Sequence, residues 1–179
     1  MKRTRKELQK IAEKIKLLVI DVDGVMTDGS IILDNDGNEY KIFHVRDGHG
    51  IKMLIKAGLK VAIITGRQSK VVEIRARELG ITEVYQRCHD KTAALDRILG
   101  KYGLVYEEVA YMGDDIVDVP VLRKAGIPIV VSDAADEARE SAVMVTKNRG
   151  GRGAVREVCD FLLKAKGLWG TATKEYFEI

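Results

Sequence analysis

The alternation of short β-branched runs with helical patterns is the feature that most limits how this chain can fold. Runs with strand character lie at 15–20, 60–64, 83–85, 109–112, 127–131 and, more weakly, 143–145. Helical patterns lie at 48–57, 69–79, 91–102, 115–125, 134–141 and 154–164. Strands that alternate with helices pair in parallel and are covered by helices. The sequence therefore predicts an α/β fold with a doubly wound, mostly parallel, Rossmann-like sheet.

The length favours a single domain. The chain has 179 residues, of which 46% are hydrophobic, enough to bury one core. We find no internal repeat or linker and expect one domain over residues 1–179. Residues 1–14 are basic and predict a short amphipathic helix with Leu8 and Ile11 facing inward and Thr4 as its cap.

Charge and composition exclude several classes of function. The net charge is +3, but the first sixteen residues carry +5 and the remainder −2, so the domain has no basic face, and only 6% of residues are aromatic. Nucleic-acid binding is therefore not expected. No apolar run reaches the ~20 residues of a membrane helix, and the charged N-terminus is unlike a secretion signal. Two isolated cysteines, Cys88 and Cys159, favour a reducing, cytoplasmic setting.

Two segments depart from the alternation. Residues 29–33 and 39–45 are strand-like and flank a turn at 34–38, which predicts a projecting β-hairpin over 29–45. Its apolar residues exceed what a solvated hairpin needs, so we expect it to pack against another subunit. The tail, 167–179, shows no helical period, but its aromatic residues suggest docking. Our hypothesis is that it covers an active site.

Polar residues follow the core strands at their carboxyl ends, where open α/β sheets bind ligands. Asp21 and Asp23 follow the first strand, Thr65 follows the 60–64 strand, and Asp114 follows the 109–112 strand. Lys91 begins the helix at 91–102. Carboxylates at one edge repel one another unless they hold a cation, and oxygen ligands suit Mg²⁺. The sequence predicts a magnesium site among Asp21, Asp23 and Asp114.

A magnesium site at this edge would attract a phosphoryl group. Thr65 and the amides of the following helix start would bind its oxygens, and Lys91 would offset the negative charge. We expect Asp21 to attack phosphorus as the nucleophile and Asp23 to act as general acid and base. Each of these short motifs alone is weak, and their common order and placement carry the prediction.

These motifs, in this order, resemble those of haloacid dehalogenase superfamily phosphatases. The residues that carry the resemblance are Leu18-Val-Ile-Asp-Val-Asp-Gly-Val-Met-Thr-Asp28, Ile64-Thr-Gly-Arg67, Lys91 and Gly113-Asp-Asp115. The hairpin, Phe43-His-Val-Arg-Asp-Gly-His-Gly50 and Gly150-Gly-Arg-Gly153 are similar to the 3-deoxy-D-manno-octulosonate 8-phosphate phosphatases. That family hydrolyses a phosphorylated eight-carbon sugar acid in lipopolysaccharide biosynthesis.

The resemblance implies specific roles and partners. Asp21 and Asp114 would bind Mg²⁺ through their side chains, Asp23 would bind it through its carbonyl, and Asp115 would support it through water. Substrate contacts would come from Asp23, His44, Val45, Arg46, Asp47, Gly48, Lys52, Arg67, Arg75 and Lys91. The spacing leaves no room for a cap domain, and the resemblance implies a homotetramer with hairpins at its centre and subunits closing one another's sites. Cys88 and His89 are predicted to be structural.

Three alternatives stay open on the sequence. A phosphatase for nine-carbon, sialic-type sugar acid phosphates would have nearly the same motifs. A phosphoacceptor regulatory domain also combines carboxylates, threonine, lysine and Mg²⁺ on a doubly wound sheet. A non-catalytic interaction module is the third, although facing carboxylates with no function would be an electrostatic liability.

Overall fold

The structure, a computed structural model, describes residues 4–177. Within this range six strands form one sheet in the order β5-β4-β1-β6-β7-β8, and every neighbouring pair is parallel. Its strands are β1 (Leu17–Ile20), β4 (Lys60–Ile64), β5 (Glu83–Tyr85), β6 (Val109–Gly113), β7 (Ile127–Val130) and β8 (Met144–Val145). All four residues of β1 are buried, as expected for a central strand covered on both faces. The predicted strands are confirmed, with ends shifted by one or two residues.

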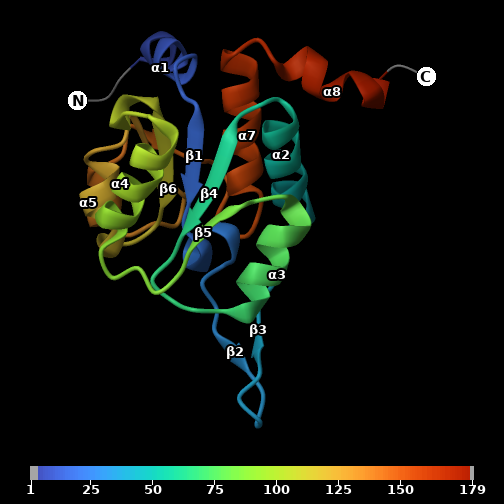
Figure 1. Ribbon diagram of the computed structural model, residues 1–179, viewed down its shortest axis with the longest axis vertical. Coiled ribbons are helices and arrows are strands. Elements are labelled where there is room, and N and C mark those ends of the chain that lie inside the picture. Colours follow the sequence, from blue (N-terminus) through green and yellow to red (C-terminus); the bar gives the residue numbers. More distant parts are fainter. Residues whose placement is uncertain (1–3, 178–179) are drawn as a thin grey trace.

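Helices cover both faces of the sheet, which confirms the doubly wound arrangement (Figure 1). One face carries α2 (Val45–Lys56), α3 (Lys70–Leu79) and α7 (Ala154–Ala165), and the other carries α4 (Lys91–Tyr102) and α5 (Val119–Leu122). A short helix, α6 (Asp136–Glu140), contacts α5. Single turns η2 (Tyr106–Glu108) and η3 (Ile116–Asp118) flank β6. None of the helices in residues 4–177 has the length and apolar character needed to cross a membrane.

The N-terminal helix, α1 (Arg5–Ala12), forms as predicted but ends two residues earlier. Thr4 caps it in a reciprocal pair: the Glu7 amide donates to Thr4 Oγ1 at 3.3 Å, and the Thr4 amide donates to Glu7 Oε2 at 2.8 Å. Leu8 and Ile11 pack against the core. Residues 1–3 lie outside the described range.

The hairpin projects beyond the carboxyl ends of the sheet strands (Figure 1). Its paired strands, β2 (Ile32–Leu33) and β3 (Glu39–Tyr40), are shorter than predicted. The Asp34 side chain shapes the turn by accepting from the amides of Asp36 and Asn38 at 2.9 and 2.8 Å. More than half of the surface of Ile31, Leu33 and Ile42 is exposed, whereas Phe43 packs against the core.

The prediction that the tail lacks a helix is wrong, because Trp169–Phe177 forms α8. Its inward residues, Trp169, Ala172, Thr173 and Tyr176, have helical spacing, but two of them are small and one is polar, so the apolar pattern is faint. Tyr176 Oη lies 3.1 Å from His49 Nε2 of α2. The helix lies at the end of the sheet opposite the hairpin (Figure 1), away from the chain's own strand carboxyl ends.

No cap domain interrupts the described chain. Between Asp23 and Thr65 lie the hairpin, α2 and β4, and between Thr65 and Lys91 lie α3 and β5. The edge formed by the carboxyl ends of the central strands is therefore left open to solvent.

Candidate active site

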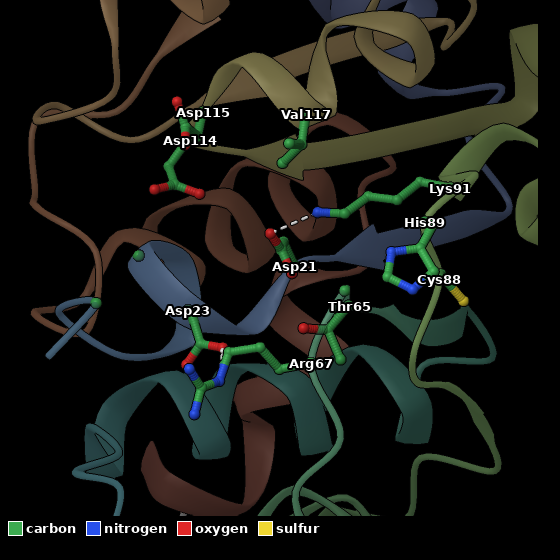
Figure 2. A pocket seen from close by; sticks show the side chains of 13 residues that line it. Asp21, Asp23, Thr65, Arg67, Cys88, His89, Lys91, Asp114, Asp115 and Val117 are labelled. Atoms are coloured by element: carbon green, nitrogen blue, oxygen red, sulfur yellow. Dashed lines mark hydrogen bonds and ion pairs between the residues drawn. The ribbon is translucent and has the colours of Figure 1, made fainter. Parts of the chain in front are cut away.

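The predicted catalytic residues meet at a cavity of about 380 Å³ beyond the carboxyl ends of β1, β4 and β6 (Figure 2). Three chain turns and the start of α4 bring them together, because parallel strands end at a common edge. The cavity is lined by Asp21, Asp23, Gly24, Gly29, Thr65, Gly66, Arg67, Cys88, His89, Lys91, Asp114, Asp115 and Val117.

Close packing of glycines shapes the turn after β1, labelled η1 (Val22–Met26). Gly24 has a φ of +86°, and a Cβ there would lie 2.0 Å from Asp114 Oδ2. A Cβ on Gly150 would lie 1.8 Å from the Gly24 carbonyl oxygen. The glycine-rich segment ahead of α7 thus allows two loops to pack directly against each other behind the carboxylates.

Asp21 is only 5% exposed and both of its carboxylate oxygens are partnered. Oδ1 accepts from the Val22 amide at 2.7 Å, and Oδ2 accepts from Lys91 Nζ at 2.6 Å. Lys91 Nζ donates a second hydrogen to Asp118 Oδ1 at 2.6 Å. An ammonium has three hydrogens, so among the described residues one is left for an incoming anion.

Asp118 anchors the cluster and is absent from the sequence-based predictions. It is completely buried. Its Oδ1 accepts from Lys91 and from the Tyr111 hydroxyl at 2.5 Å, and its Oδ2 accepts from the amides of Asp114 and Asp115 at 2.9 and 3.3 Å. The available signal is an acid three residues after Asp115, on a turn that faces a buried tyrosine and lysine.

The three carboxylates fit a divalent cation. Ligand atoms of Asp21, Asp114 and Asp118 lie within 4.8 Å of one another. Oxygen donors suit Mg²⁺. Because Asp118 already accepts four hydrogen bonds, Asp21 and Asp114 are the side chains best able to coordinate the ion.

The carboxylates are electrostatically unfavourable in the absence of a cation. Burial, followed by the charges of Asp118 and Asp21, raises the pKa of Asp114 to about 7. Burial also raises the pKa of Asp21 to about 6, partly offset by the attraction of Lys91. A cation between the carboxylates would restore their charged forms.

These pKa shifts predict how the metal-free protein responds to pH. Both values lie above the ordinary 3.8, so the folded protein binds protons more tightly than the unfolded chain. Its stability is therefore fully present below the unfolded-state pKa and falls as the pH rises through about 6 and 7. We expect the Tm in EDTA to fall between about pH 5 and pH 8, and excess Mg²⁺ to remove most of that fall.

Asp114→Asn is the matched control, because it removes the larger shift and should flatten the profile. Thermal unfolding in EDTA and in Mg²⁺ measures the effect. A Tm that is constant or rises over this range in EDTA would contradict the interpretation.

Asp23 lies at the front of the cavity among charged partners. Its carboxylate contacts the Lys41 ammonium, and Arg67 Nε lies 3.7 Å from its Oδ2. Arg67 also pairs with Glu39 of β3 at 3.0 Å. The cavity is thus connected to the hairpin through ion pairs.

Thr65 lies on the opposite wall and is 3% exposed. Its amide donates to the Tyr85 carbonyl at 2.9 Å, and its carbonyl accepts from the Cys88 amide at 3.0 Å. The side chain reaches the cavity (Figure 2). The helix that follows begins only at Lys70. Thr65 is therefore placed to meet an anion, whereas the α3 start is several residues away along the chain.

Cys88 and His89, predicted to be structural, line the cavity beside Lys91 (Figure 2). The sequence offered no pattern for them, because they occupy an irregular loop. Arg87 in this loop has a φ of +54°, which turns the chain at that point.

Only three of the predicted substrate residues line this cavity: Asp23, Arg67 and Lys91. A second hollow, about 370 Å³, includes His44 and Arg46, and a third includes Val45 and Arg75. The exposed side chain of Lys52 lies on α2. Seven predicted residues therefore lie outside the catalytic cavity of the same chain: His44, Val45, Arg46, Asp47, Gly48, Lys52 and Arg75.

Two of these seven have evident packing roles. Asp47 is buried and accepts from the amides of Gly153 and Arg156 at 3.2 and 2.7 Å, which caps the N-terminus of α7. A Cβ on Gly48 would lie 2.3 Å from an Arg75 nitrogen, so the glycine leaves space for that side chain.

Comparisons with known proteins agree with this geometry. The family model of haloacid dehalogenase-like hydrolases matches residues 69–158. The 3-deoxy-D-manno-octulosonate 8-phosphate phosphatase KdsC of Escherichia coli K12 is 50% identical over 156 residues, covering 87% of this chain and 83% of KdsC.

Two solved structures are also similar. The phosphatase of that name from Yersinia pestis has a TM-score of 0.90 and 47% identity, covering 91% of this chain and 88% of that one. The Moraxella catarrhalis phosphatase, in complex with a magnesium ion, a phosphate ion and a KDO molecule, has a TM-score of 0.94 and 40% identity, covering 97% and 99%.

Proposed function

Because this chain belongs to the haloacid dehalogenase-like hydrolases, and within them to the family of 3-deoxy-D-manno-octulosonate 8-phosphate phosphatases, we propose that it converts this sugar acid phosphate to the free sugar acid and phosphate. The observation that carries the proposal is the Asp21 carboxylate held by Lys91 at the base of a cavity with Asp23 in front. The regulatory-domain and interaction-module alternatives are set aside by the family.

In the first step an Asp21 oxygen attacks phosphorus while the bond from phosphorus to the sugar oxygen breaks. Asp23 gives its proton to the departing oxygen, and the products are an aspartyl phosphate and the free sugar acid. Lys91 has one hydrogen available for a phosphoryl oxygen, and Thr65 offers a hydroxyl from the opposite wall.

In the second step a water oxygen attacks the aspartyl phosphate. Asp23 takes the proton from that water, the bond between Asp21 and phosphorus breaks, and phosphate leaves. The enzyme returns to its starting state with Asp23 protonated.

The Asp21 and Asp114 side chains, with the Asp23 carbonyl, would hold Mg²⁺, which supplies positive charge for the phosphoryl oxygens when bound. Asp115 would support the ion from its place on the cavity wall. Asp118 instead orients Lys91 and the backbone of the Asp114 loop.

The uncapped cavity offers the sugar few contacts, so we propose that copies of the chain complete one another's sites in a homotetramer joined through the hairpin. The exposed Ile31, Leu33 and Ile42 support this assembly. Further support comes from His44 Nδ1 and Arg75 Nε, which are buried yet have no hydrogen-bond partner in the described part of the chain. The two free cysteines favour a cytoplasmic enzyme.

The assembly can be tested with Leu33→Lys, which places a charge on a hairpin side chain that is 59% exposed. We expect sedimentation to show a smaller species than the wild type, since an ammonium buried in an interface is costly. Activity on the sugar substrate should fall about tenfold or more. Val105→Lys, at a similarly exposed position outside the hairpin, is the matched control. An unchanged sedimentation coefficient for Leu33→Lys would contradict assembly through the hairpin.

The substrate can be tested by phosphate release from the eight-carbon sugar acid phosphate, its nine-carbon analogue and p-nitrophenyl phosphate, each in Mg²⁺ and in EDTA. We expect metal-dependent release that strongly favours the eight-carbon substrate. A preference for the nine-carbon analogue would support the alternative phosphatase, and equal weak release from all three would reject both sugar acids.

A further inference from the structure

Lys41 is a buried lysine at the base of the hairpin. Its side chain is 1% exposed, and its ammonium contacts the Asp23 carboxylate and lies 3.4 Å from Glu39 Oε1. Removing an ammonium from water is costly unless it is paired. The mechanism above does not use Lys41, so its burial beside the acid/base carboxylate calls for an explanation.

Lys41 belongs to a closed ring of alternating charges, which we call the charge ring: Asp23, Lys41, Glu39 and Arg67. Each member contacts the next, from Asp23 to Lys41, Lys41 to Glu39, Glu39 to Arg67 at 3.0 Å, and Arg67 back to Asp23 at 3.7 Å. These residues come from the turn after β1, the hairpin and the turn after β4. The ring therefore fastens the hairpin to two of the loops that form the cavity.

The two cations of the charge ring differ in freedom. Arg67 is 44% exposed and lines the cavity, so it can turn towards an anionic substrate. Lys41 is enclosed and does not line the cavity. When Arg67 engages a substrate, Lys41 remains as the fixed cation for both Asp23 and Glu39.

We propose that Lys41, held by Glu39, is a positioning residue that fixes the Asp23 carboxylate for proton transfer. The inference rests on the proposed phosphatase mechanism. A general acid must lie within hydrogen-bond reach of the departing oxygen, and a misplacement of about 1 Å can cost about 100-fold in rate. The hairpin base thus takes part in catalysis without touching the substrate.

The test compares leaving groups in Lys41→Met. A sugar alkoxide needs a proton to leave, whereas p-nitrophenolate leaves without one. We expect the first turnover of the sugar acid phosphate to slow about 30- to 100-fold. The first turnover of p-nitrophenyl phosphate should change less than about threefold, followed by slow turnover as the aspartyl phosphate awaits its base. This pattern is a burst of p-nitrophenol.

Two further variants separate charge from packing. Lys41→Arg keeps the cation and should recover part of the sugar rate, and Glu39→Gln should show the same leaving-group pattern with a smaller loss. Lys101→Met is the matched control, because it removes an ion pair with Glu83 outside the cavity and should leave both first turnovers unchanged.

Equal slowing of both first turnovers, or no slowing of either, would overturn the proposal. If Lys41→Met does not unfold cooperatively, Lys41→Arg and Glu39→Gln carry the same comparison. If the wild type cleaves p-nitrophenyl phosphate but not the sugar acid phosphate, the proposed substrate fails, and a simple alkyl phosphate then serves as the poor leaving group for Lys41.

Discussion

Asp21→Asn is expected to lower phosphate release by about 10⁴-fold or more, with either a sugar or an aryl substrate. A neutral amide is a poor nucleophile, so the loss should not depend on the leaving group. The fold should persist, because Lys91 keeps its pair with Asp118 and the Val22 amide can still donate to the asparagine oxygen. Phosphate release and mass spectrometry of acid-quenched protein measure both the rate and the phosphoenzyme.

The same measurement distinguishes the two carboxylates that follow β1. Asp23→Asn should still become phosphorylated by p-nitrophenyl phosphate and then hydrolyse slowly, so the phosphoenzyme accumulates. Asp136→Asn, at the exposed start of α6, is the control for the loss of a surface carboxylate. Asp21→Asn activity above about one hundredth of the wild type would indicate direct attack by water instead.

The sheet and the catalytic cluster could be predicted because they follow from local patterns. The strand runs specify a parallel sheet, and a parallel sheet brings the ends of its strands to one edge. Asp21, Thr65 and Asp114 each come directly after a strand, so the topology alone places them together. Their distance in sequence is irrelevant to that argument.

Residues whose roles depend on tertiary packing were harder to predict. Asp118 and Lys41 look like ordinary surface charges in the sequence, and only the folded chain shows that each is buried against a catalytic residue. His89 reaches the cavity from an irregular loop with no period to read. The tail helix was missed because its inward face is built partly from alanine and threonine.

The predicted sugar contacts show a different limit. His44, Arg46 and Arg75 come from the family resemblance, and the single chain places them outside the catalytic cavity. A resemblance transfers residues without saying which copy of the chain they act in. The hairpin test above bears directly on that question, since an assembly is the simplest way to bring them to a substrate.

Asp118→Asn is expected to cost about 3–5 kcal/mol of stability, as is typical when one partner of a buried ion pair is removed. Asp118 accepts from charged Lys91 and the Tyr111 hydroxyl on one oxygen and from two amides on the other. Asparagine has one acceptor oxygen, so its NH₂ group must face donors in either orientation. Denaturant unfolding in EDTA measures the loss.

Activity should fall about 100-fold or more in Asp118→Asn, because Lys91 loses the partner that orients it towards the phosphoryl group. Tyr111→Phe is the matched control: it removes one hydrogen bond to the same oxygen, should cost about 1 kcal/mol, and leaves the ion pair intact. If Asp118→Asn were no less stable and no less active than Tyr111→Phe, the buried carboxylate would be one polar contact among several. The expected gap between the two variants instead makes Asp118 the residue that joins the stability of the β6 edge to the alignment of the catalytic lysine.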